Sequence, residues 1–478
     1  MLRRGLDNND NSVVRLLDDE PDLLALHRQA PERYPFLLQS TASDSAHGRF
    51  DILFACPGEA LVLDQVGCLE VGSLEVGSLE AGDLEVGSLE GDGNQPEFLK
   101  ALDEQWRSVA ISESALELPF TGGWFLYLGY ELAAEIEPDL EHEVDPDLPA
   151  AFAVRCKAAL VRDRLAGQNF LVYEPDVAPD IDQVLNDVAK CLTGQAQPYQ
   201  QAAGRLDVGE EAAGDFIAAV NKAKEHIAAG DVYQANLSRC WTASADRKPD
   251  ADRIYESLSQ SNPAPFAGLA RWKEATIISS SPERLLRIRD GIISTRPIAG
   301  TRPRSDDQDT DISLSAELFS NAKEIAEHVM LIDLERNDLG RVCEPGTVEV
   351  DEMMVLESYS HVHHIVSNVR GKLQINVTPG DAIRAVFPGG TITGCPKVRC
   401  MEIIQKLENG PRGAYTGSFG YLNRDGSLDL NILIRTMVAR NNSISFRAGS
   451  GIVADSDPEA ELAETRAKAK GMLRALAI

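Results

Sequence analysis

Two pairs of glutamates at helical spacing place the strongest constraint on how this chain can fold. Glu324 and Glu327 lie in KEIAEHVMLIDLERNDLGRV, and Glu461 and Glu464 lie in DPEAELAETRAKAK. Residues three apart share one face of a helix, so each pair can direct two carboxylates to one place. Four converging carboxylates would repel one another unless a cation lay between them, and Mg²⁺ prefers oxygen ligands. The alternative is that both pairs are solvated faces of exposed helices in an acidic protein.

The charge and hydropathy of the chain limit its partners. It has 46 Lys and Arg against 75 Asp and Glu, a net charge of -29. Because such a surface repels phosphate backbones, we expect no nucleic-acid partner. No apolar run approaches the ~20 residues that span a bilayer, and the opening MLRRGLDNND lacks a signal-peptide core, so we expect no membrane partner and a cytoplasmic location. The 8 cysteines form no CxxC pair, which predicts neither zinc nor a disulfide framework.

Two segments of unusual composition indicate how the chain is divided. Over 69–93 a pentapeptide repeats as LEVGS, LEVGS, LEAGD, LEVGS and LEGDG. A five-residue period with glycine in every copy fits neither helix nor strand, so we interpret it as an acidic insertion within an N-terminal region, residues 1–192. The polar stretch TGQAQPYQQAAGRLDVG predicts a linker over 193–212, followed by a second domain over 213–478.

The second half of the chain mixes helical and strand patterns. Apolar residues recur at helical spacing from Phe216 to Ile227, which predicts an amphipathic helix. From Leu428 to Val438 apolar residues alternate strictly, which predicts one strand packed on one face, with Arg435 on the other face. The preceding NRDG predicts a turn, and the DP before EAELAETRAKAK is typical of a helix N-terminus.

Several longer motifs occur in a fixed order in the chain. They are STRPIAGTRPR, AEHVMLIDLERNDLGRVC, SHVHHIVSNV, FPGGTITGCPKVRCMEII, GSFGYL and AGSGIVADSDPEAELAETRAKA. Together they resemble the chorismate-utilising enzymes, a family that includes anthranilate synthase component I, aminodeoxychorismate synthase component I, isochorismate synthase and salicylate synthase. The resemblance is dense over 215–478 and looser before it. It implies an α+β fold in which two β-sheets stack orthogonally, with helices outside.

The resemblance assigns chemistry to the acidic residues. It implies that Glu324, Glu327, Glu461 and Glu464 bind Mg²⁺, which as a Lewis acid would stabilise charge pushed toward the ring carboxylate of chorismate. Glu283, in SSPERLL, matches the general acid of the family. A carboxyl that donates a proton near neutral pH needs a raised pKa, which a water-poor pocket provides. On spacing alone Glu283 would be an ordinary glutamate after a strand.

Gln234, in GDVYQANLSR, indicates which nucleophile is used. Family members that add water resemble this segment but carry a lysine there, whose deprotonated amine can activate water. An amide cannot act as that base, whereas ammonia has its own lone pair. Gln234 therefore predicts amination and argues against isochorismate or salicylate as the product. The alternative is a buried amide that is bonded to backbone.

Further residues match the substrate pocket of the family. Arg435 can form a bidentate pair with a substrate carboxylate, and Tyr421 can donate from its hydroxyl. GSG predicts a turn whose backbone N–H groups approach an anion. His364 is placed with Glu283 and Gln234 among the catalytic residues, although a histidine between apolar neighbours is more often a core residue. The remaining predicted substrate contacts are Thr391, Gly449, Ser450, Gly451 and Lys468, and a looser match predicts a possible tryptophan pocket at Leu38, Ser40 and Arg49.

The motifs disagree about the product. FPGGTITG, HVHHIVS, IDLERNDLG and HGRFDIL are closer to aminodeoxychorismate synthases, so we predict 4-amino-4-deoxychorismate, on the folate route to 4-aminobenzoate. PIAGT, however, places Ala299 where many of those enzymes carry a lysine proposed as a transient nucleophile. Anthranilate, on the tryptophan route, is therefore the alternative. A catalytically inactive chorismate-binding homologue is the third hypothesis, opposed by the presence of every acidic residue.

The predicted amination needs a source of ammonia. The sequence contains no GxCxG glutaminase motif, and no cysteine has the context of a glutamine-hydrolysing nucleophile. We therefore expect a separate glutamine amidotransferase subunit as the partner that supplies ammonia.

Overall fold

The computed structural model describes residues 4–5, 12–42, 48–73, 87–88, 97–112, 117–140, 145, 147–194, 206–305, 307–320, 322–358 and 362–477. The helices are α1 Leu23–Gln29, α2 Phe98–Val109, α3 Ala133–Ile136, α4 Ala178–Leu192, α5 Ala213–Ala228, α6 Ala251–Ser261, α7 Gln308–Ser320, α8 Ala322–Gly340, α9 Pro379–Val386, α10 Lys397–Leu407 and α11 Pro458–Leu476, with short 3-10 turns η1 Tyr130–Leu132, η2 Pro175–Val177 and η3 Gly390–Ile392.

The strands of the first half are β1 Arg4–Gly5, β2 Val13–Leu17, β3 Phe36–Gln39, β4 Phe50–Leu63, β5 Leu69–Ser73, β6 Gly87–Ser88, β7 Gly123–Leu128, β8 Ala151–Asp163, β9 Gln168–Tyr173 and β10 Leu206–Glu210. Those of the second half are β11 Gln234–Ala245, β12 Phe266–Trp272, β13 Ala275–Ser281, β14 Arg284–Arg289, β15 Ile292–Thr295, β16 Ile298–Pro303, β17 Glu349–Ser358, β18 Val362–Lys372, β19 Gly394–Cys395, β20 Ser418–Asn423, β21 Leu428–Asn431, β22 Thr436–Arg440 and β23 Ser443–Ile452.

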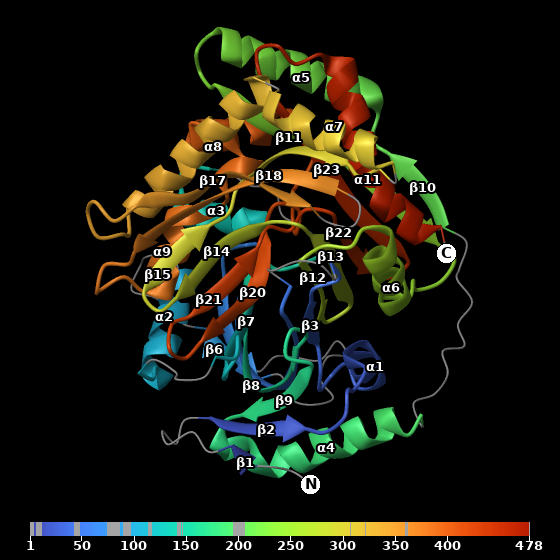
Figure 1. Ribbon diagram of the computed structural model, residues 1–478, viewed down its shortest axis with the longest axis vertical. Coiled ribbons are helices and arrows are strands. Elements are labelled where there is room, and N and C mark those ends of the chain that lie inside the picture. Colours follow the sequence, from blue (N-terminus) through green and yellow to red (C-terminus); the bar gives the residue numbers. More distant parts are fainter. Residues whose placement is uncertain are drawn as a thin grey trace.

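The described strands form one hydrogen-bonded network with helices around it, which confirms the α+β class. N-terminal elements such as β2, α1, α4 and β9 lie at the bottom of Figure 1, and α5, α7 and α8 lie at the top. Strand β3 pairs with β12, and β7 pairs with β20, so strands of the two halves are hydrogen-bonded to each other at these two places. The end of the predicted linker is also ordered, because β10 pairs with β11.

Aromatic side chains fill the layer where the two halves meet. Phe36 from β3 stacks on Phe125 from β7, with ring centroids 4.0 Å apart. Phe152 from β8 stacks on Trp272 from β12 at 4.2 Å. All four are buried, and large apolar side chains contribute about 25 cal/mol per Å² of surface removed from water. Of these two stacks, that of Phe152 on Trp272 joins a strand of the first half to a strand of the second half.

Two predicted helices are confirmed. Helix α5 covers the predicted stretch, and the side chain of Asp457 caps α11 by accepting from the Ala460 N–H at 2.9 Å. In α8 the apolar side chain of Val329 is 46% exposed. The buried face carries His328 and Glu335 among its apolar residues, so the amphipathic pattern is hidden by buried polar groups.

The single strand predicted over 428–438 is wrong. The chain forms two separate strands here, β21 and β22, and residues 432–435 between them belong to neither strand. Arg435 lies in this break with a φ of 53°, a left-handed conformation that is uncommon outside glycine. The turn predicted at Gly449 to Gly451 is also wrong, because these residues belong to β23 and pair with β11.

The pentapeptide repeat was predicted to disfavour strands, but its first copy is a strand. Leu69–Ser73 forms β5 and pairs with β4, and Gly87–Ser88 forms β6 and pairs with β5. Most of the repeat lies outside the described residues. The ladder contacts of β4 therefore override the unfavourable composition of that first copy.

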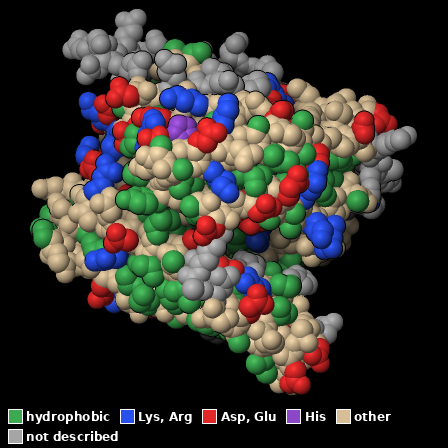
Figure 2. Space-filling model, turned by 90° about the horizontal axis from the view of Figure 1, so that it is seen from above, with side chains coloured by type: hydrophobic (Ala, Val, Ile, Leu, Met, Phe, Trp, Pro, Cys, Tyr) green, Lys and Arg blue, Asp and Glu red, His purple; other side chains and the backbone are tan. Residues whose placement is uncertain are grey.

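Charges on the described surface are mixed in sign. Figure 2 shows acidic and basic side chains interspersed over the face seen from above. Exposed ion pairs of the described chain include Arg466 with Glu210. Among the described residues, no helix is both long and apolar enough to cross a bilayer.

Candidate active site

Glu283 lies in the turn between β13 and β14, buried with 6% of its surface exposed. The hydroxyl of Thr391 donates to its Oε1 at 2.8 Å, and the Ile432 N–H donates to its backbone oxygen at 3.0 Å. Burial, assisted by the negative charge of Glu335, raises the pKa of Glu283 to about 7, although Thr391, Arg435 and Lys468 act in the opposite direction. Near neutral pH this carboxyl therefore holds a proton for a large part of the time.

Glu335 is a second buried carboxyl at this site, and it was missed in the sequence. The 3-10 turn η3 contacts both acids, because the Gly390 N–H bonds to Glu335 and the Thr391 hydroxyl bonds to Glu283. Burial and the charge of Asp338 raise the pKa of Glu335, and Lys397 on α10 lowers it. The Oε2 atom of Glu335 is buried and accepts no hydrogen bond from a described residue. Its only signal was its helical spacing from the apolar residues of α8.

Arg435 supplies a half-buried positive charge beside Glu283. Its backbone oxygen accepts from the Ser280 N–H at 3.1 Å, which fixes the strained residue to β13. Burial lowers the pKa of Arg435, and the charge of Glu283 opposes that shift. The guanidinium forms no hydrogen bond or ion pair with a described residue. It is therefore available to an anionic ligand, as the sequence predicts.

Gln234 begins β11 at the edge of this site. Gln234 pairs with Cys395 in β19, and it is 7% exposed. The amide Oε1 is buried without a hydrogen-bond partner in the described part of the chain. A Cβ at Gly451 would lie 2.3 Å from Nε2, so glycine is required there for the amide to occupy this place. The alternative of an amide bonded to backbone through that oxygen is not what the structure shows.

Lys468 and Tyr415 lie on either side of Gly449. The Lys468 Nζ donates to the Gly449 backbone oxygen at 2.9 Å, and a Cβ at Gly449 would lie 2.7 Å from the Tyr415 hydroxyl. The sequence predicts Tyr421 as a substrate contact and does not indicate Tyr415. A single tyrosine beside a glycine-rich strand carries no pattern that separates it from a core residue. Ser450, between the glycines, is fully buried.

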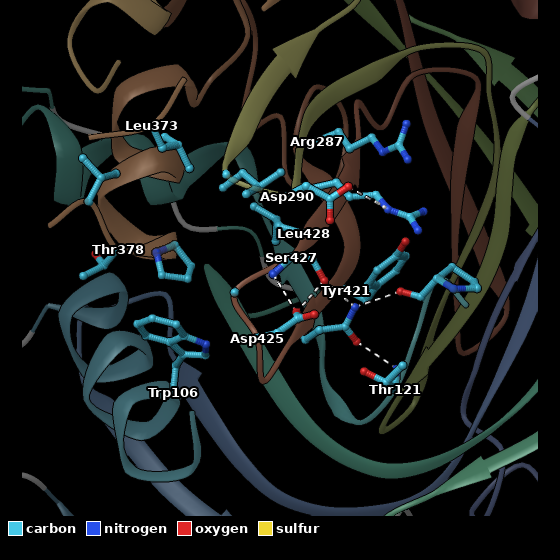
Figure 3. Close-up of a pocket in the computed structure, with 18 of the residues that line it drawn as sticks. Trp106, Thr121, Arg287, Asp290, Leu373, Thr378, Tyr421, Asp425, Ser427 and Leu428 are labelled. Atoms are coloured by element: carbon cyan, nitrogen blue, oxygen red, sulfur yellow. Dashed lines mark hydrogen bonds and ion pairs between the residues drawn. The ribbon is translucent and has the colours of Figure 1, made fainter. Parts of the chain in front are cut away.

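The structure places Tyr421 away from this group. It lines the cavity of about 430 Å³ shown in Figure 3, with Trp106, Thr121 and Arg287, and neither Glu283 nor Arg435 lines that cavity. Burial raises the pKa of Tyr421, and the other charges that act on it are those of Asp429 and arginines on β14. The predicted contact of Tyr421 with chorismate thus has no support in this geometry.

His364 lies on β18 and is 2% exposed. Burial and the positive charge of Arg435 lower the pKa of His364 to about 4, so its imidazole is neutral at pH 7. The electrostatic contact with Arg435 associates it with Glu283. The neighbouring His363 instead points to Ser358 and Asp311, at 2.7 and 3.0 Å.

The four glutamates predicted to hold Mg²⁺ do not form one coordination group in this structure. Helix α8 packs on β16 and β18, whereas α11 packs on α5, α6 and β23. In Figure 1, α8 lies at the upper left and α11 at the upper right. Glu324 pairs with Arg302 at 2.9 Å, and Glu464 pairs with Lys468 at 2.8 Å. Within the described chain, no three His, Cys, Asp or Glu side chains are arranged to hold a metal. The remaining two, Glu327 and Glu461, are half-buried and buried.

Two of the three residues predicted for a tryptophan pocket line one cavity. Leu38 and Ser40 lie with Phe266 and Phe419 around a cavity of about 100 Å³. Arg49 does not line it. Its guanidinium pairs with Asp163, at 2.7 Å. Occupation of this cavity by tryptophan stays a prediction.

The cysteines show no sign of an activated thiol. All 8 are free, and burial raises the pKa of 7 of them. A thiolate nucleophile needs a lowered pKa. None of these 7 thiols is therefore suited to hydrolysing glutamine.

The chain is similar in sequence and in structure to known proteins. The model of the family described as chorismate binding enzyme matches residues 73–474. The anthranilate synthase component I-like protein of Synechocystis sp. is 43% identical over 362 residues, which cover 75% of this chain and 73% of that protein. Anthranilate synthase component 1 of Cereibacter sphaeroides is 35% identical and covers 99% of this chain and 96% of its own. The crystal structure of anthranilate synthase component I from Streptococcus pneumoniae TIGR4 superimposes with a TM-score of 0.74 at 30% identity, covering 90% of this chain and 93% of that one.

Proposed function

The chain belongs to the family of chorismate binding enzymes, and from this premise we propose that it aminates chorismate with ammonia to give anthranilate and pyruvate. The observation that carries the proposal is a buried acid, Glu283, facing an unpaired guanidinium, Arg435, with an amide at Gln234. The similar proteins include anthranilate synthases, which supports anthranilate as the product.

Glu283 acts as the proton donor. Loss of the ring hydroxyl of chorismate requires a proton on the departing oxygen, and a carboxyl with a pKa of about 7 can supply it near neutrality. Arg435 pairs with a substrate carboxylate. This pairing of charges also holds the substrate carboxylate close to Glu283. Thr391 orients Glu283 through the hydrogen bond to Oε1.

Gln234 admits ammonia without activating water. Its amide has no basic lone pair at neutral pH, so water that enters the site finds no general base at this position. Ammonia needs none. The same residue therefore favours an amino product over a hydroxyl product.

His364 acts in the second half of the proposed reaction. Amination leaves a ring that becomes aromatic only when it loses a proton and the pyruvate side chain. A neutral imidazole can accept a proton, and His364 is neutral at pH 7 because its pKa is lowered to about 4. This step distinguishes anthranilate from a product that keeps the side chain.

The second candidate function is the formation of 4-amino-4-deoxychorismate. The four segments cited above favour it, but the names of the similar proteins favour anthranilate, and the methyl group of Ala299 cannot act as a nucleophile. We therefore reverse the order of the two products expected from the sequence.

The proposal includes Mg²⁺ and a separate glutamine amidotransferase subunit. Carboxylates are the ligands that Mg²⁺ prefers, and bound Mg²⁺ would supply Lewis-acid chemistry. In this structure Glu324 and Glu464 are ion-paired, so they would have to exchange Arg302 and Lys468 for the ion. We expect EDTA to remove activity and added Mg²⁺ to restore it. A partner that supplies ammonia is consistent with the absence of an activated thiol in the described chain.

The test is direct. The purified chain is incubated with chorismate, Mg²⁺ and ¹⁵N-ammonium chloride, and the products are identified by mass and fluorescence. We expect fluorescent ¹⁵N-anthranilate and an equal amount of pyruvate. A ¹⁵N product that retains the side chain would favour the second candidate. Isochorismate, or no consumption of chorismate, would contradict amination.

A further inference from the structure

Two side-chain amides lie next to each other on the same face of β11. Gln234 and Asn236 are two residues apart, so they point to the same side of the strand. Both lie over the glycines of β23, because a Cβ at Gly451 would be 2.3 Å from Gln234 Nε2 and a Cβ at Gly449 would be 3.0 Å from Asn236 Oδ1. The register agrees, since Asn236 pairs with Gly451.

Both amides have a buried oxygen that accepts no hydrogen bond. Gln234 Oε1 and Asn236 Oδ1 have no partner among the described residues. The backbone of Asn236 is fully bonded, with its N–H donating to the Thr393 oxygen at 2.9 Å and its oxygen accepting from Arg412 at 2.8 Å. Leaving a buried acceptor unpaired costs about 1–3 kcal/mol, so two adjacent ones indicate a ligand with several donors.

The third polar group nearby is the Tyr415 hydroxyl. It lies 2.7 Å from the place a Gly449 Cβ would take, on the same side as Asn236 Oδ1. The hydroxyl forms no hydrogen bond with a described residue. Because residues 449 and 451 are glycines, the Tyr415 hydroxyl, Asn236 Oδ1 and Gln234 Nε2 can lie against β23 at places that Cβ atoms would otherwise occupy.

The hydrogen-bonding groups of the reactants determine which of them can donate to the two amide oxygens. Chorismate offers two carboxylates, which only accept hydrogen bonds, and one hydroxyl that the reaction removes. Ammonia offers three N–H donors and a single lone pair. Two unpaired acceptors can therefore both be satisfied by ammonia, with its lone pair left free to attack the ring.

We propose that Gln234 and Asn236 together form the ammonia-binding site of this enzyme, with their amide oxygens accepting two N–H groups of one ammonia molecule. The inference rests on the proposed amination and adds Asn236 to it as a residue that determines specificity for the nucleophile. Ammonia keeps its third N–H for the Tyr415 hydroxyl. On attack, the nitrogen lone pair forms the C–N bond while the ring C–O bond breaks and Glu283 protonates the departing oxygen as water.

The test is steady-state kinetics with ammonium chloride as the probe, analysed against the concentration of free ammonia. Asn236→Leu keeps the shape of the side chain and removes both polar atoms. We expect the KM for ammonia to rise about 5- to 10-fold, the effect of one ordinary hydrogen bond, with kcat at saturating ammonia and the KM for chorismate changed less than twofold. Asn236→Asp, which keeps an oxygen acceptor in place, should bring the KM for ammonia back toward the parent value.

Thr242→Val on the same strand is the matched control, because Thr242 is exposed and lies beyond the amide pair. It should leave all three constants unchanged. An active enzyme whose KM for ammonia is unaltered by Asn236→Leu would overturn the inference and leave the amination intact. A parent chain that fails to aminate chorismate would overturn both. Because the Asn236 side chain bonds to no described residue, the melting temperature of Asn236→Leu should match the parent within about 2 °C.

Discussion

Two buried glutamates in this protein, Glu283 and Glu408, have opposite electrostatics. Both are almost fully removed from water, yet the pKa of Glu283 is raised to about 7 and that of Glu408 is lowered. Burial raises the pKa of Glu408 too, but the charges of Arg412 and Arg447 outweigh it, at 2.6 and 3.2 Å. The Ser238 N–H adds a further bond at 2.7 Å.

The difference teaches that the supply of donors, and not burial, separates a structural carboxylate from a reactive one. Glu408 has two guanidinium partners and a backbone N–H, so its charge is compensated within the fold. Glu283 has one hydroxyl donor and a second acid, Glu335, in its surroundings. Arg435 and the Gln234 Oε1 atom also have no partner among the described residues, and we propose the substrate as the partner of Arg435.

The largest expected effect is on turnover. Glu283→Gln removes the proton and keeps the shape, so kcat should fall by about 10²- to 10⁴-fold, while chorismate binding measured by calorimetry stays within about threefold. Glu408→Gln should leave kcat within an order of magnitude once the protein is folded. Parent-like turnover in Glu283→Gln would remove the proton-donor assignment.

The opposite effect is expected on stability. Glu408→Gln leaves two buried guanidinium groups without their counter-ion and should lower the free energy of unfolding by about 3–5 kcal/mol. Glu283→Gln should lower it by less than about 1 kcal/mol, because it removes an incompletely compensated acid. Urea unfolding of both variants checks this. Equal losses would mean that the two sites do not differ in compensation.

Gly451→Ala probes how tightly Gln234 is placed. The added Cβ would lie 2.3 Å from Nε2, so the amide must move or the strands must separate. We expect a loss of about 1–3 kcal/mol in the free energy of unfolding together with a higher KM for ammonia. Gly209→Ala in β10, where the added Cβ would meet only the Thr242 oxygen at 3.9 Å, is the control.

The pH dependence of stability should also separate the two acids. Glu283 has a folded pKa of about 7, above the ordinary value of 4.5, so the folded state holds an extra proton in this window and loses stability as pH rises through it. Glu283→Gln should therefore gain stability relative to the parent between pH 5 and 8. Glu408 has the opposite sign, since its contribution is present above the ordinary pKa and is lost as pH falls toward the folded value. Thermal melts of the parent and both variants at several pH values measure this.

The smallest effect concerns Glu335. Its negative charge is among the causes that raise the pKa of Glu283, so Glu335→Gln should move the alkaline limb of the kcat/KM profile to lower pH by less than about one unit. The profile is measured at constant free ammonia. A limb that stays in place would show that the two acids titrate independently.

The sequence predicted the helices and acids of this site better than its backbone. Motif order identified Glu283 and Gln234, and helical spacing identified α8 and α11. Alternation could not reveal the break at Arg435, because the apolar residues continue through it in the strand period. Spacing also could not show that Glu335 lies beside Glu283, since that contact joins distant segments through η3. Tyr415 and Asn236 were missed for the same reason, as their roles depend on glycines in a neighbouring strand.

The most direct test of the central claim is the protonation state of Glu283 itself. The infrared spectrum of Glu283→Gln is subtracted from that of the parent at a series of pH values. The account predicts a protonated carboxyl band at pH 6 that disappears with a midpoint near pH 7. A difference spectrum with no such band at any pH above 5 would contradict it.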